Sequence, residues 1–152
     1  MKVLAVRNEL CNGCGECEKV CAMTFFKVPY RDRSAIRVER VSDARHEVAF
    51  CDQCGECIVV CPTSALYRIK NGIVRLREAE CVGCVACIGF CPAMVMYALP
   101  DNMVPIKCIA CGKCVDVCPT KALSMIDIGV PPAVTEVTRS IRAKTGASSH
   151  GH

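Results

Sequence analysis

Sixteen cysteines in 152 residues form four copies of the spacing C-x2-C-x2-C-x3-C, and no cysteine lies outside them. The copies are numbered here as motifs one to four. They comprise Cys11, Cys14, Cys17 and Cys21; Cys51, Cys54, Cys57 and Cys61; Cys81, Cys84, Cys87 and Cys91; and Cys108, Cys111, Cys114 and Cys118. Three thiolates at this spacing can hold three corners of a [4Fe–4S] cubane, while the fourth cysteine ligates a neighbouring cluster. The sequence therefore predicts four [4Fe–4S] clusters with these sixteen cysteines as ligands.

The residues around each motif predict how the cysteines are positioned. The x3 step carries the fourth cysteine down a helical turn, and proline follows it in three motifs, which would end the helix at Pro62, Pro92 and Pro119. Ala22 takes this place in motif one, so the helix there can continue, with Phe25 and Phe26 shielding the cluster. Glycine follows the second cysteine in three motifs, where a missing Cβ lets the backbone approach sulfur; Val85 takes this place in motif three.

Zinc is the main alternative metal, because thiolates bind it well. Structural zinc sites usually combine two C-x2–4-C pairs separated by a longer segment, often with histidine. Four equal four-cysteine runs, three of them closed by proline, favour iron–sulfur clusters. No nucleophile–base pair, phosphate-binding glycine loop or dinucleotide fingerprint accompanies them, so we expect no catalytic residues in this chain.

Composition limits the class of protein further. With three tyrosines, four phenylalanines and no tryptophan, a two-cluster unit is too small to depend on a hydrophobic core. Cluster ligation must supply much of the folding free energy, and the metal-free chain should be largely unfolded. Arg7 and Glu9 interrupt any signal-peptide apolar region, and no run approaches the ~18 apolar residues of a membrane-spanning helix. We expect a cytoplasmic protein without a membrane span.

The formal net charge of +4 does not indicate a nucleic-acid partner. An oxidised [4Fe–4S] core with four thiolates carries about −2, so four clusters bring the holoprotein to about −4. The arginines between positions 31 and 45 alternate with acidic residues and lack aromatic side chains for base stacking. We interpret this segment as a solvated connection between motifs one and two; a docking face for a protein is the alternative.

The segments between motifs bear on how the cysteines pair. Between motifs two and three lies ALYRIKNGIVRL, in which Asn71 and Gly72 predict a β-hairpin with a type I′ turn. With this hairpin, motifs two and three look like a complete two-cluster ferredoxin. The segment VMYALPDNMVPI after motif three is a weaker hairpin candidate, because Pro100 and Pro105 oppose regular pairing.

Short β-rich runs at residues 2–6 and 122–126 flank the cysteine region. The likeness to a ferredoxin implies that a strand before the first motif pairs with a strand after the last. This favours an α+β fold of two nested 2[4Fe–4S] ferredoxin-like units with short helices and small β-hairpins. The inner unit would comprise residues 46–99 and the outer unit residues 1–45 and 100–128. Sequential pairing, motif one with two and motif three with four, stays open.

Nesting assigns the ligands of each cluster. The outer unit would bind its clusters through Cys11, Cys14, Cys17 and Cys118, and through Cys108, Cys111, Cys114 and Cys21. The inner unit would use Cys51, Cys54, Cys57 and Cys91, and Cys81, Cys84, Cys87 and Cys61. Residues 129–152 would form a C-terminal helix and a flexible tail, since Val134, Val137 and Ile141 are spaced like one helical face.

Over residues 1–128 the chain resembles the four-cluster polyferredoxin subunits of bacterial and archaeal oxidoreductase complexes. The resemblance depends on the sixteen cysteines, on the Cys21–Ala22 step, and on the PTSAL and PTKAL segments after Cys61 and Cys118. It implies an electron-transfer subunit, not an enzyme, that relays single electrons between a catalytic subunit and a flavin- or quinone-linked acceptor.

The short loops and uniform spacing look most like the small iron–sulfur subunit of multi-subunit tungsten aldehyde oxidoreductases, which implies a catalytic partner with tungsten or molybdenum. The iron–sulfur subunit of a hydrogenase, formate dehydrogenase or carbon monoxide dehydrogenase, and a freely diffusing polyferredoxin, are the alternatives. Copies stacked end to end could extend the path for electrons.

Overall fold

The computed structural model describes residues 1–129. Its elements follow the chain in the order β1 (Lys2–Val6), η1 (Asn8–Leu10), α1 (Glu16–Phe26), η2 (Arg31–Arg33), β2 (Arg37–Ser42), β3 (Arg45–Ala49), α2 (Glu56–Val59), β4 (Leu66–Arg68), β5 (Val74–Leu76), η3 (Glu78–Glu80), α3 (Ala86–Gly89), β6 (Tyr97–Leu99), β7 (Asn102–Ile106), α4 (Lys113–Asp116) and β8 (Leu123–Asp127). The helix and tail predicted after residue 129 lie outside the described residues.

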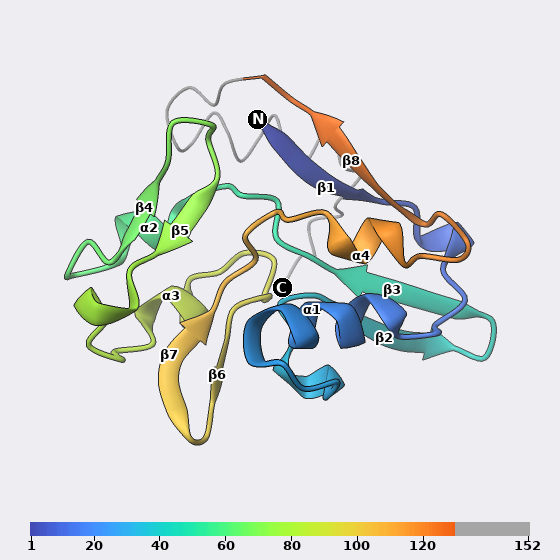
Figure 1. Cartoon of the computed structure of the whole chain (residues 1–152), viewed down its shortest axis with the longest axis horizontal. Coiled ribbons are helices and arrows are strands. Elements are labelled where there is room, and N and C mark those ends of the chain that lie inside the picture. The colour runs from blue at the N-terminus through green and yellow to red at the C-terminus, as the bar shows by residue number, and fades with distance from the viewer. Residues whose placement is uncertain (130–152) are drawn as a thin grey trace.

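These elements gather in two groups joined through the centre of the molecule (Figure 1). The elements β4, β5, α2 and α3 lie on one side, and β1, β8, α1, α4 and the β2–β3 hairpin lie on the other, with the β6–β7 hairpin projecting between them. The strands form two-stranded sheets, β1–β8, β2–β3, β4–β5 and β6–β7. The predicted α+β fold, with short helices and small antiparallel sheets, is confirmed.

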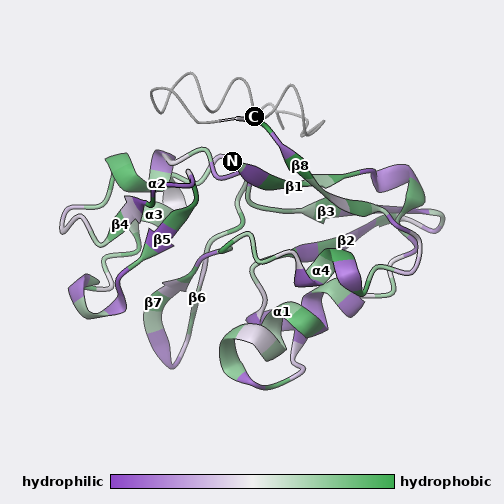
Figure 2. Cartoon of the chain, turned by 45° about the horizontal axis from the view of Figure 1, so that its top comes forward, coloured by the Kyte–Doolittle hydropathy of each residue, from purple (hydrophilic) through white to green (hydrophobic). Residues whose placement is uncertain are grey.

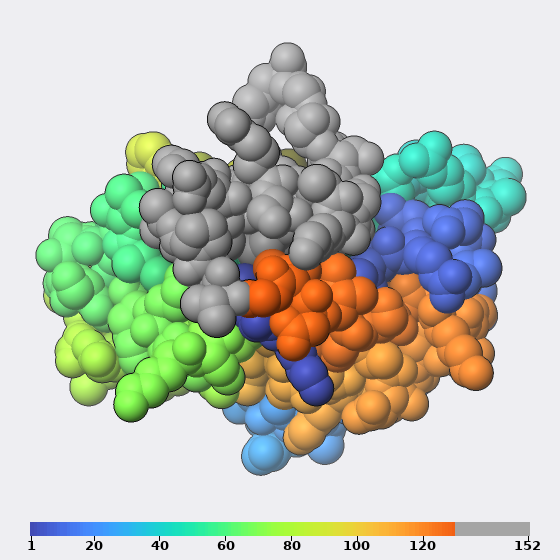
Figure 3. All heavy atoms as spheres, turned by 90° about the horizontal axis from the view of Figure 1, so that it is seen from above, coloured from blue at the N-terminus to red at the C-terminus, as the bar shows by residue number. Residues whose placement is uncertain are grey.

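The two strands at the ends of the cysteine region pair with each other. β1 and β8 are antiparallel, with a register that runs from Lys2 opposite Asp127 to Val6 opposite Leu123. The N–H of Arg7 continues the ladder by donating to the carbonyl of Ala122 at 2.8 Å. Seen from above, the chain's first residues therefore lie directly beside residues near 120 (Figure 3). Both predicted strands are confirmed.

A residue in the left-handed conformation precedes each of the four α-helices. Its φ is 75° at Gly15, 93° at Gly55, 79° at Gly112 and 54° at Val85. Glycine adopts this conformation without a steric penalty, which explains its presence in three motifs more directly than close approach to sulfur does. A β-branched residue in this region is strained, so motif three holds Val85 at a cost.

Motif one differs from the others at its fourth cysteine, as the absence of proline predicts. Helix α1 has eleven residues and continues through Cys21 and Ala22 to Phe26, whereas α2, α3 and α4 have four residues each. It ends at Lys27, whose φ is 60°, and the N–H of Lys27 donates to the carbonyl of Met23. The longer helix brings Phe25 beside the cysteines of motif four.

The hairpin predicted between motifs two and three is present, but its turn differs from the prediction. β4 and β5 are antiparallel, with Tyr67 opposite Arg75. The N–H of Gly72 donates to the carbonyl of Ile69 at 2.8 Å, and only Gly72 has a positive φ, so the turn is centred on residues 70 and 71. The predicted type I′ turn over Asn71 and Gly72 is therefore wrong. Asn71 instead accepts a hydrogen bond from the N–H of Ile73 through its side chain at 3.1 Å.

The second candidate hairpin is also present. β6 and β7 are antiparallel, with a shift of register between Tyr97 and Leu99. Pro105 lies within β7 and removes a ladder donor, in keeping with the expected irregular pairing.

The segment interpreted as a solvated connection is largely exposed, but it forms a further hairpin that the sequence analysis did not predict. β2 and β3 are antiparallel, and Val38 lies opposite Val48. Although most of β2 is exposed, Ile36, Val48 and Phe50 are buried in one core with Leu4, Cys17 and Leu123. The two-residue spacing of the apolar Ile36 and Val38 around Arg37, and of the larger apolar residues Val48 and Phe50, carries the signal. This hairpin spans the expected boundary between residues 45 and 46.

Small apolar clusters, in part built from the cysteines themselves, take the place of one large core. One of them, Met1, Val3 and Ile73, packs the terminal strands against the β4–β5 hairpin. Another contains Cys57 and Cys87 together with Leu66, Val74 and Met96. Hydrophobic and hydrophilic stretches are interspersed in both parts of the molecule (Figure 2). Among residues 1–129, no helix is long and apolar enough to cross a membrane.

Candidate metal centres

Three concave sites are each lined by four cysteines that come from two different motifs. One site is lined by Cys11, Cys14, Cys17 and Cys118; a second by Cys21, Cys108, Cys111 and Cys114; and a third by Cys61, Cys81, Cys84 and Cys87. In each site, three cysteines of one motif meet the fourth cysteine of another. The structure thus brings together motifs one and four, and motifs two and three.

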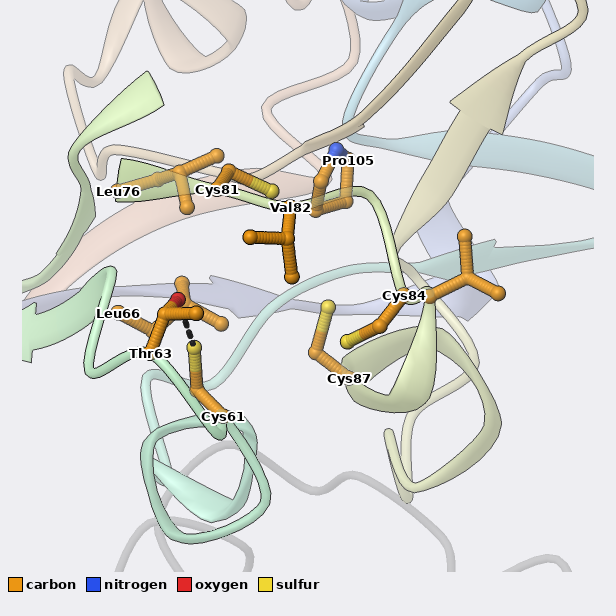
Figure 4. Close-up of a pocket in the computed structure, with 10 residues that line it drawn as sticks. Cys61, Thr63, Leu66, Leu76, Cys81, Val82, Cys84, Cys87 and Pro105 are labelled. Atoms are coloured by element: carbon orange, nitrogen blue, oxygen red, sulfur yellow. Dashed lines mark hydrogen bonds between the residues drawn. The ribbon is translucent and has the colours of Figure 1, made fainter. Parts of the chain in front are cut away.

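Figure 4 shows how the third site is built. The sulfur atoms of Cys61, Cys81, Cys84 and Cys87 point toward a shared space, which Leu66, Leu76, Val82 and Pro105 border with apolar surface. Cys61 comes from the end of motif two, Cys81 and Cys84 come from the loop of motif three, and Cys87 comes from helix α3. Pro105 of β7 lies on the far side of this space, so the β6–β7 hairpin contributes to its wall.

Of the remaining four cysteines, three are buried near β4, β5 and α2, and Cys91 is half-buried. Cys51, Cys54 and Cys57 are all buried, with at most 7% of their surface exposed. Cys57 interacts electrostatically with Cys51 and Cys91, and Cys91 packs against the apolar cluster that contains Cys57. Twelve of the predicted ligands therefore line the three concave sites, and the grouping of Cys51, Cys54, Cys57 and Cys91 in a fourth set stays a prediction.

Burial raises the pKa of seven of these thiols in the absence of metal. Loss of hydration raises the pKa of Cys17 and Cys57 to about 12 and that of Cys87 to about 11. It also raises the pKa of Cys21, Cys54, Cys108 and Cys114. Because only the thiolate binds iron, these thiols must release their protons when a cluster binds.

Two cysteines behave in the opposite way. Burial acts to raise the pKa of Cys61, but the N–H of Leu66 and the hydroxyl of Thr63 lower it below its usual value. The same holds for Cys118, with the N–H of Leu123 and the hydroxyl of Thr120. Each cysteine sulfur lies 3.7 Å from its threonine Oγ1. The PTSAL and PTKAL segments therefore place hydrogen-bond donors around these two sulfurs, which stabilises the thiolate.

Polar side chains that the sequence did not single out surround the motif-one loop. A Cβ at Gly13 would lie 2.3 Å from Nε2 of His46, and a Cβ at Gly15 would lie 2.5 Å from Cζ of Arg31. The buried carboxylate of Glu18 accepts hydrogen bonds from Nε of Arg31 at 2.5 Å and from the N–H of Val38 at 3.0 Å. Glu18 thus fixes both Arg31 and the β2–β3 hairpin over the motif-one cysteines.

Two buried polar residues near motif two were also missed by the sequence analysis. Gln53 and Lys107 expose 0% and 4% of their surface. Burial acts to lower the pKa of Lys107, but the thiolates of Cys51 and Cys108 raise it above its usual value. A lysine directly before a cluster cysteine is the only signal in the sequence, and nothing local reveals that it is buried.

The four cysteine sets fit [4Fe–4S] clusters better than single metal ions. Among residues 1–129, no group of three or more histidine, cysteine, aspartate or glutamate side chains could hold one metal ion. The three concave sites instead each place four cysteines around a shared space that is open to solvent. An all-thiol donor set around such a space, with apolar walls and N–H donors to sulfur, suits a cluster.

Comparison with protein families identifies iron–sulfur domains along most of the cysteine region. The description "4Fe-4S dicluster domain" matches three overlapping or adjacent segments, residues 10–66, 50–95 and 73–119. The first match covers motifs one and two, the second covers motifs two and three, and the third covers motifs three and four. Successive pairs of motifs are thus each recognised as a two-cluster unit.

Two curated proteins are similar to parts of the chain. The uncharacterized ferredoxin-like protein YdhX of Escherichia coli (strain K12) is 36% identical over 78 residues, which is 46% of this chain and 35% of YdhX. The NADH-dependent phenylglyoxylate dehydrogenase subunit beta of Aromatoleum evansii is 38% identical over 61 residues, which is 37% of this chain and 14% of that subunit. The chain therefore spans only a minor part of the length of either relative.

Solved structures resemble the chain over nearly its whole length. A chain of the active site complex BamBC of benzoyl coenzyme A reductase, in complex with zinc, is 25% identical with a TM-score of 0.51, and the match covers 97% of this chain and 93% of that chain. The complex with benzoyl-CoA gives 20% identity and a TM-score of 0.50, with 99% and 93% covered. The second match shows a shared fold alone.

Proposed function

Because the chain carries tandem 4Fe–4S ferredoxin-like domains across residues 10–119, we propose that it is the iron–sulfur electron-transfer subunit of a multi-subunit oxidoreductase. The observation that carries the proposal is the completeness of its cysteine sets. Each set has four thiols, so four [4Fe–4S] clusters leave no iron open to a substrate. In this role the substrate chemistry belongs to a partner subunit.

The ligands we propose for each cluster are those of the nested arrangement. The grouping of motif-one cysteines with Cys118, and of motif-four cysteines with Cys21, supports an outer unit made from both ends of the chain. The grouping of motif-three cysteines with Cys61 supports an inner unit between them. The pairing of β1 with β8 supports the same division, with the inner unit near residues 46–99.

When bound, the clusters supply storage and transfer of one electron at a time. The chain's own residues control the environment in which this happens. Buried thiols and apolar neighbours such as Leu66, Phe25 and Val48 exclude water from the sulfur atoms. The hydroxyls of Thr63 and Thr120 and the N–H of Ala35, which lies 3.3 Å from Sγ of Cys21, stabilise negative charge on the terminal cysteines.

The partner we propose is a catalytic oxidoreductase subunit with a tungsten or molybdenum cofactor, together with a flavin subunit as a second partner. Support comes from the relatives: one is the beta subunit of an NADH-dependent dehydrogenase, and a similar chain occurs in the BamBC active site complex. The compact loops between motifs, which resemble those of tungsten aldehyde oxidoreductase subunits, support the choice of metal.

Exposed apolar side chains near motif three favour a bound subunit over a freely diffusing carrier. Val82, Phe90, Met94 and Met103 each expose more than half of their surface, and Cys84 is itself exposed. Side chains of this kind at the edge of a cluster site are typical of a surface that another protein covers.

Anaerobic purification of the chain from its source tests the proposal. We expect about sixteen iron and sixteen sulfide per chain, broad absorbance near ~400 nm, and co-elution with a larger subunit that contains tungsten or molybdenum. If the chain instead elutes without a partner and exchanges electrons rapidly with several unrelated oxidoreductases, it is a free carrier. Stoichiometric zinc in place of iron would exclude any electron-transfer role.

A further inference from the structure

Lys107 is a buried cation at the junction of the inner and outer groups. Its Nζ donates hydrogen bonds to Sγ of Cys51 at 3.0 Å, to Oε1 of Gln53 at 3.1 Å and to the carbonyl of Cys108 at 3.0 Å. These bonds use all three ammonium protons. No ion pair found within residues 1–129 joins Lys107 to a carboxylate. Its positive charge is therefore directed at sulfur.

A network of hydrogen bonds holds this ammonium group in place. Nε2 of Gln53 donates to the carbonyl of Cys108 at 3.0 Å, and Oε1 of Gln53 also accepts from the N–H of Val74 at 3.0 Å. Nη1 of Arg68 donates to the carbonyl of Gln53 at 3.0 Å, and Nη2 donates to that of Cys54 at 2.8 Å. The network connects the motif-two loop to the start of motif four. It thereby holds the Lys107 side chain in one conformation.

The cysteines that Lys107 faces are the most deeply buried set of the four. Cys51, Cys54 and Cys57 are all buried, whereas Cys14, Cys84 and Cys111 are exposed in the other three motifs. A charge added in a buried site is poorly screened by water, so a nearby cation affects it strongly. The buried carboxylate of Asp52 acts in the opposite direction, but Arg68 adds a second positive charge beside this loop.

Among residues 1–129, Lys107 is the only cation whose side chain donates a hydrogen bond to a cysteine sulfur. Arg37 acts electrostatically on Cys21 and Lys113 lines the Cys21 and Cys108 site, but neither donates such a bond. In motif one, Arg31 is paired with the carboxylate of Glu18. In motifs three and four, the nearest side chains over the loop glycines Gly83 and Gly112 are the uncharged Met103 and Met125. Lys107 also lies next to Cys108, but there it contacts the carbonyl and not the sulfur.

We propose that Lys107 raises the reduction potential of the cluster bound by Cys51, Cys54 and Cys57, so that electrons collect at the junction of the two units. The inference rests on the proposed function for the identity of the cluster and its ligands. The step concerned adds one electron to an oxidised cluster, changes its core from the 2+ to the 1+ level, and moves no proton or atom. The reductant is a low-potential one-electron donor: dithionite with mediators in the test, and the catalytic partner in the complex.

The test compares charge variants of the cluster-loaded protein. Lys107→Met and Lys107→Gln remove the charge, Lys107→Arg keeps it, and Lys70→Met removes an equal charge from an exposed position in the β4–β5 loop. Each variant is analysed for iron and sulfide, then titrated with dithionite under potential control while electron paramagnetic resonance follows the reduced clusters. A cluster count equal to that of the unchanged protein shows that a shift in potential is not a loss of structure.

In Lys107→Met and Lys107→Gln, we expect the equilibrium constant for reduction of one cluster to fall about tenfold, a potential lower by about 59 mV for a one-electron couple. We expect a smaller fall in the equilibrium constant for reduction of the cluster bound by Cys108. The equilibrium constants of the other two clusters should not change. Lys107→Arg should stay within about threefold of the unchanged protein, and Lys70→Met within about twofold. The reduction step that shifts most in the titration should be absent from Cys57→Ala. Its absence would assign that step to the cluster of motif two.

Three results of the titration would overturn the proposal. They are unchanged potentials in a fully loaded Lys107→Gln, an equal shift in Lys70→Met, and a shifted wave that survives in Cys57→Ala. Loss of iron from both neutral variants but not from Lys107→Arg would assign Lys107 a structural role and would also overturn it. The titration needs no partner protein, so failure to co-purify with an oxidoreductase would refute the proposed function and leave this result standing.

Discussion

Val3 lies opposite Ile126 in the β1–β8 pair, and its side chain is completely buried against Met1 and Ile73. This contact joins the two ends of the cysteine region to each other and to the hairpin of the inner group. We expect Val3→Ala to destabilise the loaded protein by about 2 kcal/mol, because it removes buried methyl groups and leaves a cavity. The guanidinium midpoint for loss of cluster absorbance measures the effect.

Val41→Ala is the matched control for Val3→Ala, since Val41 lies on β2 with 55% of its surface exposed. It should leave the midpoint nearly unchanged. Equal midpoints for both variants would show that the terminal strands contribute little to holding the clusters.

Glu18 provides a second prediction, because it is a buried carboxylate with two partners. Glu18→Ala leaves the N–H of Val38 and the guanidinium of Arg31 without their acceptor, so we expect a loss of about 2–3 kcal/mol. Glu18→Gln keeps an acceptor for Val38 and should lose less. Glu16→Ala, which breaks an exposed pair with Lys19, should cost under about 1 kcal/mol. If Glu16→Ala and Glu18→Ala gave equal denaturant midpoints, this account of Glu18 would fail.

The sequence predicts those features whose signals are local. Cysteine spacing indicates the clusters, the missing proline at Ala22 indicates the longer α1, and the flanking β-rich runs indicate the terminal strands. The sequence analysis missed the β2–β3 hairpin because the many charged residues of this segment obscure the two-residue spacing of the apolar Ile36 and Val38.

The long-range contacts of single polar side chains could not be predicted from the sequence. The position of Lys107 depends on Cys51 and Gln53, which lie more than fifty positions earlier in the chain and reach it only after both units have folded. No local pattern distinguishes this lysine from a solvated one. The burial of Glu18 likewise depends on a hairpin that packs over α1 only in three dimensions.

Strain at Val85 gives a third prediction. Its φ of 54° is unfavourable for a β-branched residue, so Val85→Gly should stabilise motif three by about 1 kcal/mol. The reverse change in motif two, Gly55→Val, should destabilise, because a Cβ there would lie 2.2 Å from Nη2 of Arg68. The rate at which a chelator removes iron from each variant measures both effects. Slower loss from Gly55→Val than from the unchanged protein would contradict this explanation of the left-handed residues.

Paired cysteine variants test the ligand assignment. If Cys21 and Cys108 bind one cluster, Cys21→Ala, Cys108→Ala and the double variant should each retain about twelve of sixteen iron atoms. The combination of Cys21→Ala with Cys57→Ala should retain about eight, since it removes two clusters. Sequential pairing requires the opposite result, because Cys21 would then belong with the motif-two cysteines.

The raised thiol pKa values predict how iron retention depends on pH. Protons and iron compete for the same sulfur atoms, and Cys17 and Cys57, with a pKa of about 12, bind protons more tightly than ordinary thiols. Iron loss to a chelator should therefore accelerate as the pH falls, by at least about tenfold between ~pH 8 and ~pH 6. The bleaching of absorbance near ~400 nm under anaerobic conditions measures the rate.

Any residual fold in the metal-free chain should respond to pH in the opposite direction. A thiol whose pKa rises from 9.0 when unfolded to about 12 when folded contributes stability that is complete below pH 9. That stability is lost as the pH rises from 9 toward 12, because the buried thiols must then ionise. Alkaline pH should thus favour retention of iron by the loaded protein. It should favour unfolding of the metal-free protein, which circular dichroism measures. A metal-free chain whose dichroism is constant from ~pH 8 to ~pH 11 would show that it retains no structure in which these thiols are buried.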